Sequence, residues 1–157
     1  MSAQSYTTSF TVDQSPEEVF KAVTNVRGWW SEGIQGGTEK QDDEFVFEVP
    51  GVHFSRQKLV EVIPGERVVW LITEATMTFI QQKDEWVGTK VIFDITKEGD
   101  KTKLTFTHEG LVPHIECYKF CMPAWEQYVD GSLFKLVTTG RGTPNLEGSS
   151  IEKPAEV

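Results

Sequence analysis

Turn-forming residues divide the middle of the chain into extended segments, and this pattern limits the possible folds most strongly. Pro50-Gly51 and Pro64-Gly65 match the central positions of type II turns, and the stretch EGDK at residues 98–101 is typical of a hairpin loop. The segments between these turns carry many Val, Ile, Phe and Thr residues, which favour strands; they are 44–49, 52–63, 67–73, 89–98 and 101–110. Because short loops join them, we expect an antiparallel sheet.

A strand and a helix are predicted at the start of the chain. Residues 6–12 alternate apolar and polar side chains, which is typical of a strand. Ser15 is a favourable N-cap, Pro16 suits the first helical position, and Glu18 completes a capping box. Apolar residues then recur at helical spacing, so we expect a helix from about residue 16 to residue 25.

The last predicted element is a long amphipathic helix. We expect it to begin near Met122-Pro123 and to end at Gly140, a residue typical of helix C-caps. Its polar residues lie mostly opposite an apolar stripe that needs cover, formed by Trp125, Val129, Leu133, Leu136 and Val137. Residues 74–86 show no clear period and receive no prediction.

This order of elements predicts an α+β fold. A curved antiparallel sheet wrapped around the long C-terminal helix, with two short helices after the first strand, satisfies it. Such a sheet leaves room for a cavity between its concave face and the helix. We expect residues 1–144 to form a single domain and residues 145–157, which are polar and contain Pro, Gly and Ser, to form a flexible tail.

Charge and hydropathy narrow the partners. The net charge of −9 disfavours nucleic acid and anionic membrane surfaces, since both attract basic patches. No apolar run approaches the length of a membrane span, and the first ten residues do not resemble a signal peptide. We therefore expect a cytoplasmic protein in which Cys117 and Cys121 are thiols.

Two adjacent tryptophans, Trp29 and Trp30, follow the first predicted helix and precede a glycine-containing polar run. Neighbouring side chains point in different directions in both helices and strands, so we expect only one of the two rings to face inward. One interpretation is a core tryptophan beside a surface tryptophan. The other makes one ring the wall or lid of a cavity mouth, where an indole combines an apolar ring with an N–H donor.

Residues 52–63 leave open which face of the strand is buried. One face carries Phe54, Arg56 and Lys58, and the other carries His53, Ser55, Gln57 and Leu59. If the Phe54 face points inward, Arg56 reaches the cavity and can pair with an acidic ligand group. In the alternative, Arg56 extends to the rim or pairs with a nearby glutamate.

Histidine and cysteine supply the other candidates. His108 shares a strand face with Leu104 and Phe106, so we expect it at the inner end of that strand, as a hydrogen-bonded structural residue or as a base. His114, Cys117 and Cys121 have the spacing of one helix face and resemble a zinc site, but no fourth ligand is apparent. We expect no metal and no cofactor.

Four stretches together resemble a known family: F.VDQSPEEVFKAVTNVRGWW, LVEVIPGERVVWLI, EWVGTKVIFDITKEGDKTKLTFTHEGL and CYKFCMPAWEQYVDGSLFKLVTTGRG. They run through residues 6–145 and are similar to the SRPBCC superfamily, also called START or helix-grip domains. Within it, the chain resembles the group named after the activator of heat-shock protein 90 ATPase. The resemblance implies a helix-grip fold with a cavity, binding of hydrophobic small molecules or cyclase and hydrolase activity, and a chaperone as a possible partner.

Three hypotheses on function remain. The first is binding of a small hydrophobic molecule between sheet and helix, with the ligand contacted by Trp29, Trp30, Phe54, Arg56, Trp70, Phe106, His108, Trp125 and Tyr128. The second is a cyclase or hydrolase, although the sequence carries no catalytic motif. The third is a protein-interaction module, such as a chaperone partner, which predicts an exposed apolar patch. The sequence does not fix the ligand or the oligomeric state.

Overall fold

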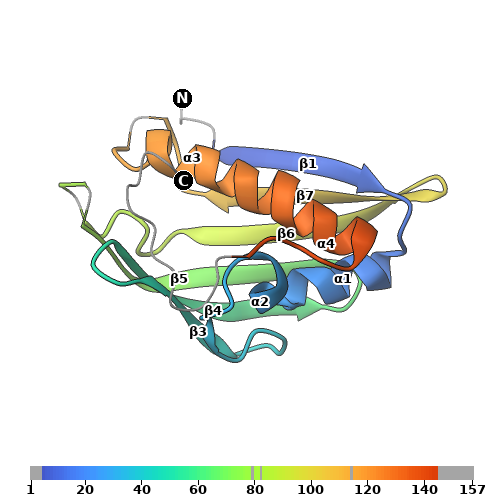
Figure 1. Ribbon diagram of the computed structural model, residues 1–157, viewed down its shortest axis with the longest axis horizontal. Coiled ribbons are helices and arrows are strands. Elements are labelled where there is room, and N and C mark those ends of the chain that lie inside the picture. Colours follow the sequence, from blue (N-terminus) through green and yellow to red (C-terminus); the bar gives the residue numbers. More distant parts are fainter. Residues whose placement is uncertain (1–4, 79, 82, 114, 145–157) are drawn as a thin grey trace.

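Seven antiparallel strands form one sheet in the computed structural model, which describes residues 5–78, 80–81, 83–113 and 115–144 (Figure 1). The order across the sheet is β1-β7-β6-β5-β4-β3-β2. The bounds are β1 Tyr6–Val12, β2 Gln35–Gly36, β3 Glu44–Val49, β4 His53–Ile63, β5 Arg67–Met77, β6 Lys90–Glu98 and β7 Lys101–Glu109. The hairpins predicted around Pro50-Gly51, Pro64-Gly65 and Gly99 are confirmed.

Two short helices follow β1, as predicted. Helix α1 (Pro16–Thr24) begins with the expected capping box. The backbone N–H of Glu18 donates to Ser15 Oγ at 3.2 Å, and the backbone N–H of Ser15 donates to Glu18 Oε1 at 3.0 Å. These bonds satisfy two backbone donors that a helix start leaves free. Helix α2 (Val26–Trp29) follows at once.

The C-terminal helix lies across one face of the sheet (Figure 1) and consists of three parts. An α-helical start, α3 (Tyr118–Trp125), is followed by a π-helical stretch, η1 (Glu126–Leu133), and an α-helical end, α4 (Phe134–Thr139). The predicted C-cap is confirmed, because Gly140 adopts a φ of 86° that favours glycine. None of the helices in the described part of the chain is long and apolar enough to cross a membrane.

The predicted start of this helix near Pro123 is wrong, since α3 begins at Tyr118 and contains Pro123. The reason is a cap that the sequence does not reveal. The carboxylate of Glu85 accepts the backbone N–H groups of Glu116 at 3.0 Å and Cys117 at 2.8 Å. This contact satisfies donors at the helix start, so the helix forms before the proline. Pro123 lies near that start and removes only one helical hydrogen bond.

The α+β helix-grip prediction is therefore confirmed, and the core lies between the sheet and the helices. Buried side chains alternate with more exposed ones along β3, β6 and β7, as in Lys101–Glu109, where every second side chain is buried. The predicted tail, residues 145–157, lies outside the described residues, so the division into a domain and a tail stays a prediction.

Candidate functional site

Five aromatic side chains between the sheet and the C-terminal helix contact one another in a closed circle, called here the aromatic box. The members come from the end of α2, from β3, from β4, from the segment before β6 and from α3, and they are Trp30, Phe47, His53, Trp86 and Trp125. In that order, with Trp125 closing back on Trp30, the ring centroids lie 4.3, 5.1, 4.7, 5.8 and 5.2 Å apart. Only the folded chain brings these residues together.

Both members of the tryptophan pair are buried, so the expectation that only one ring faces inward is wrong. Trp29 is 0% exposed and Trp30 is 1% exposed. Their rings stack 6.2 Å apart, and Trp70 of β5 stacks on both, at 6.2 Å from Trp29 and 5.7 Å from Trp30. The pair falls where α2 ends, and the chain turns there so that both side chains reach the sheet.

Neutral polar groups lie on β4 beside the box. Ser55 and Gln57 are both fully buried on the inner face of the strand. Gln57 Nε2 donates to Ser55 Oγ at 2.6 Å, and Ser55 Oγ lies 3.1 Å from His53 Nε2. Phe47 and Phe45 are the cross-strand neighbours of Ser55 and Gln57, and Trp30 contacts both phenylalanines. The two polar side chains therefore lie on the sheet next to Trp30.

Three polar atoms at the box have no hydrogen-bond partner although they are buried. They are the indole Nε1 of Trp30, the indole Nε1 of Trp86 and the amide Oε1 of Gln57. Buried polar atoms are nearly always paired, and each unpaired one costs about 1–3 kcal/mol. The box thus combines aromatic walls with two free donors and one free acceptor.

The hypothesis that Arg56 pairs with a ligand required the Phe54 face of β4 to point inward, but the opposite face does so. His53, Ser55 and Gln57 point inward, whereas Phe54 and Arg56 lie on the outer face. Arg56 Nε donates to Glu74 Oε1 at 2.6 Å, and its side chain is 38% exposed. The expectation that Phe54 and Arg56 line the cavity is therefore wrong, and the alternative of a pair with a nearby glutamate is confirmed. Burying a charged guanidinium costs far more than burying a serine and a glutamine.

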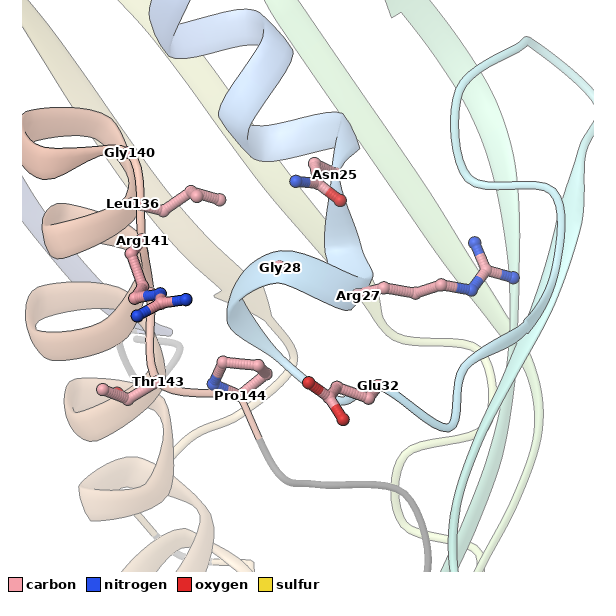
Figure 2. A pocket seen from close by; sticks show the side chains of 10 residues that line it. Asn25, Arg27, Gly28, Glu32, Leu136, Gly140, Arg141, Thr143 and Pro144 are labelled. Carbon is pink, nitrogen blue, oxygen red and sulfur yellow. The ribbon is translucent and has the colours of Figure 1, made fainter.

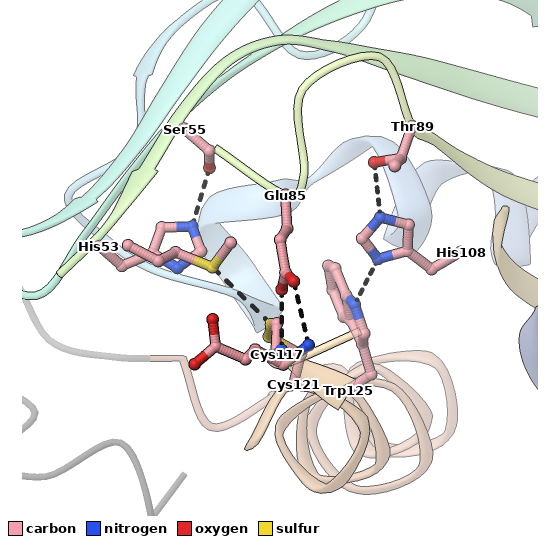
Figure 3. Close-up of a disulfide and its surroundings, with 10 residues drawn as sticks. His53, Ser55, Glu85, Thr89, His108, Cys117, Cys121 and Trp125 are labelled. Atoms are coloured by element: carbon pink, nitrogen blue, oxygen red, sulfur yellow. Dashed lines mark hydrogen bonds between the residues drawn. A yellow bond between two sulfur atoms is a disulfide. The ribbon is translucent and has the colours of Figure 1, made fainter. Parts of the chain in front are cut away.

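His108 lies at the inner end of β7, as predicted, and both its ring nitrogens are bonded (Figure 3). Trp125 Nε1 donates to His108 Nδ1 at 3.0 Å. An indole nitrogen can only donate, so Nδ1 carries no proton and Nε2 carries it. His108 Nε2 then donates to Thr89 Oγ1 at 2.8 Å, and Thr89 Oγ1 donates to the carbonyl of Trp86 at 2.6 Å. This chain of bonds fixes Trp125 and the backbone at Trp86, two walls of the box.

Both inner histidines are neutral at ordinary pH. Burial lowers the pKa of His53 to about 3. Burial, and to a smaller extent the nearby His53, lowers the pKa of His108 to about 3. A base with so low a pKa removes protons poorly at neutral pH. Among the described residues no Asp, Glu, Lys or Arg is buried, so the interior around the box carries no charge.

Cys117 and Cys121 form a disulfide in the structure, so the prediction of two thiols is wrong (Figure 3). The cysteines lie at the start of α3, and their Cα atoms are 5.6 Å apart, within the usual span of a disulfide. His114, the third residue of the zinc hypothesis, lies outside the described residues. Within the described part, no three His, Cys, Asp or Glu residues are placed to hold a metal ion.

The remaining predicted ligand contacts lie at or near the box. The ring of Phe106 packs 4.7 Å from Trp125, and Tyr128 lies 6.2 Å from Trp30 and 6.3 Å from Trp125. Sequence reasoning did not propose Phe47, His53, Ser55, Gln57 or Trp86 as site residues. A usable signal was present on β4, because both positive charges of residues 53–58 fall on one face and the other face is neutral.

A separate surface pocket of about 630 Å³ lies between α2 and the end of α4 (Figure 2). Its lining includes Asn25, Gly28, Glu32, Leu136 and Arg141. Arg27 also borders it, but its guanidinium turns away and donates to the carbonyls of Ile34 and Gly36, each at 2.9 Å. None of the predicted ligand-binding residues lines this pocket.

The family model described as activator of Hsp90 ATPase homolog 1-like protein matches residues 13–138. The chain belongs to this family. The family lies within the SRPBCC, or Bet v 1-like, superfamily, so the resemblance inferred from the sequence is confirmed. The match runs from before α1 into the last turn of α4 and includes every residue of the aromatic box.

Solved structures of other proteins share the fold of this activator-of-Hsp90-ATPase-like domain. The Aha1 dimer from Colwellia psychrerythraea is similar with a TM-score of 0.70 and 21% identity, over 88% of this chain and 99% of that one. SSP2350 from Staphylococcus saprophyticus gives a TM-score of 0.66 and 12% identity, over 91% and 98%. CalU16 from Micromonospora echinospora gives a TM-score of 0.61 and 16% identity, over 87% of this chain and 77% of that one. No curated protein matches the sequence.

Proposed function

We propose that this domain binds a small hydrophobic molecule in the aromatic box, between the sheet and the C-terminal helix. The observation that carries the proposal is the closed circle of Trp30, Phe47, His53, Trp86 and Trp125. Aromatic faces bind flat apolar molecules well, and the helix-grip fold encloses the circle between two layers. Burying about 200 Å² of apolar ligand surface would contribute roughly 5 kcal/mol before the costs of association.

Trp86 is the wall that we expect to move when a ligand enters. It belongs to the turns between β5 and β6 rather than to a strand or a helix. Its backbone carbonyl is held by Thr89, but its indole N–H has no partner. Rotating the indole therefore breaks contacts between rings but no hydrogen bond, and the displaced ring volume becomes available to the ligand.

The state of the two histidines favours binding over the cyclase or hydrolase alternative. Both ring nitrogens of His108 are hydrogen-bonded, to Trp125 and Thr89, and His53 has a pKa of about 3. Neither arrangement supports proton transfer at neutral pH. Three large apolar side chains are exposed in the described part, each in a different segment of the chain, and no observation favours the interaction-module alternative; they are Ile63, Val87 and Phe134.

Native mass spectrometry of the purified protein, compared with its mass after denaturation, tests the proposal. We expect an additional mass that disappears on denaturation, and organic extraction should release the same compound. The variants Trp86→Phe and Phe47→Leu reduce the aromatic surface of the box and keep an apolar side chain at each position. They should therefore reduce the fraction of protein that retains the ligand. Arg56→Ala is the matched control, since it changes an outer-face residue close to Ser55 on the same strand.

Two results would contradict the proposal. One is a bare chain mass that also persists after incubation with naphthalene, a small flat hydrocarbon. The other is a retained molecule whose amount falls in Arg56→Ala but not in the box variants, because that pattern would place the ligand on the outer face.

A further inference from the structure

The three unpartnered polar atoms at the aromatic box point to the chemistry of its ligand. Trp30 Nε1 and Trp86 Nε1 are donors, and Gln57 Oε1 is an acceptor. Trp30 and Trp86 belong to one closed circle of rings, and Gln57 is bonded through Ser55 to His53, which belongs to the same circle. The three free atoms therefore belong to residues of one connected cluster in the core.

The protein itself offers these atoms nothing further. The Gln57 amide nitrogen is already bonded to Ser55, and the hydroxyl of Ser55 is engaged by both Gln57 and His53. The neighbouring His108 has both nitrogens occupied. A buried group that has no partner within the chain can be paired by a water or by a bound ligand.

The absence of charge around the box limits what that molecule can be. In the described part of the chain, no basic or acidic side chain is buried, and the two histidines have pKa values of about 3. An anionic ligand would lose its hydration without meeting a cation. A cationic ammonium group can lie against aromatic faces, but it would leave both free indole N–H donors without an acceptor. The nearest positive group on β4, Arg56, lies on the other face of the strand and is paired with Glu74.

We propose that Gln57, together with the indole N–H groups of Trp30 and Trp86, selects an uncharged aromatic ligand that carries a hydroxyl group. The hydroxyl hydrogen donates to Gln57 Oε1, and the hydroxyl oxygen accepts from an indole N–H. This inference rests on the proposed binding function and adds to it the class of ligand and the residues that discriminate.

Three probes of one shape test the inference by equilibrium dialysis at neutral pH. Naphthalene has no polar group, 2-naphthol has a neutral hydroxyl, and 2-naphthoate carries a negative charge. One hydrogen bond to a buried unpaired group corresponds to about a tenfold gain in affinity, so 2-naphthol should bind about tenfold more tightly than naphthalene. The charged 2-naphthoate should bind at least about tenfold more weakly than naphthalene.

Replacing Gln57 tests whether this residue causes the preference for 2-naphthol over naphthalene. Gln57→Met keeps the volume and removes the acceptor but not the indole donors, so it should lower the affinity for 2-naphthol towards that for naphthalene, and the affinity for naphthalene should change much less. Gln57→Leu is a second variant with the same expectation, in case methionine repacks. Lys58→Met is the matched control, because it makes a similar change at the next position, on the outer face of β4, and should retain the wild-type preference.

The outcomes separate this inference from the function on which it rests. Equal binding of naphthalene and 2-naphthol by the wild-type protein overturns the inference and leaves hydrophobic binding standing. Tight binding of 2-naphthoate overturns the selection of neutral ligands. A preference for 2-naphthol that is undiminished in both Gln57 variants overturns the role of Gln57. Binding of none of the three probes overturns the proposed function and the inference together.

Discussion

Trp125 Nε1 and His108 Nδ1 lie 3.0 Å apart, and the indole donates a hydrogen bond to the imidazole in the core. The bond joins the C-terminal helix to the last strand, across the layer in which the aromatic box lies. It also fixes the proton of His108 on Nε2, where it meets Thr89 Oγ1. A single bond thus sets the position of one box wall and the tautomer of a buried histidine.

Removing this bond should destabilise the protein. Trp125→Phe leaves His108 Nδ1 buried without a donor, so we expect a loss of about 1–3 kcal/mol beyond the effect of the smaller ring. Urea denaturation measures it. Trp86→Phe is the matched control, because it removes the same part of an indole whose N–H has no partner. Equal losses in the two variants would show that the bond to His108 contributes nothing.

Stability should fall as the pH is lowered below about 6.5. In the folded protein both inner histidines have pKa values of about 3, against 6.5 for an unperturbed histidine. Between these values the unfolded chain binds more protons, so the stabilisation is complete above pH 6.5 and is lost as the pH falls towards 3. Each histidine should contribute a slope of up to about 1.4 kcal/mol per pH unit.

Urea denaturation between pH 7.5 and 5 checks this slope. Over this range the raised pKa of Asp130, which burial causes and which acts in the opposite direction, has least effect. A variant such as His53→Asn should remove about half of the slope. A free energy of unfolding that stays constant over the range would mean that the histidines are hydrated and titrate normally.

The start of the C-terminal helix should depend on Glu85. Its carboxylate accepts the backbone N–H groups of Glu116 and Cys117 and lies at the positive end of the helix dipole. Glu85→Ala should cost about 0.5–2 kcal/mol and increase hydrogen exchange in the first turn of α3. Glu66→Ala, an acidic residue in the turn between β4 and β5, is the control. Unchanged exchange in α3 would exclude a capping role for Glu85.

Two glycines near the end of the chain should respond oppositely to alanine. A Cβ at Gly142 would lie 2.5 Å from the carbonyl oxygen of Gly28 and 2.9 Å from that of Ser132, whereas a Cβ at Gly131 meets nothing within 4 Å. Gly142→Ala should destabilise by about 1–3 kcal/mol because backbone must move. Gly131→Ala should stabilise by up to about 1 kcal/mol. Thermal denaturation of the two variants distinguishes these effects. Equal midpoints would show that the carbonyls of Gly28 and Ser132 do not crowd Gly142.

Local signals predicted much of the fold. Ser15 and Glu18 predict the start of α1, Gly140 predicts the end of the C-terminal helix, and the Pro-Gly pairs predict the hairpins. Each of these signals acts within a few residues and therefore remains visible in the sequence. The inward position of His108 followed from simple alternation on β7.

The site itself depends on contacts between distant residues, and these were not predictable in the same way. The buried face of β4 is set by pairing with β3 and β5. The alternation of side chains along the strand did not indicate which of its two faces is buried. The burial of both Trp29 and Trp30 depends on how the end of α2 meets Trp70. Likewise, the early start of α3 depends on Glu85, which is 32 residues before Cys117 in the sequence.

The stacking of Trp29, Trp30 and Trp70 also has an optical consequence. Their ring centroids lie 5.7 to 6.2 Å apart, and their planes are within 15° of parallel. At this separation the electronic transitions of neighbouring indoles couple. The near-ultraviolet circular dichroism of the unlabelled protein therefore depends on the relative orientation of these rings, together with that of the stacked pair Trp86 and Trp125.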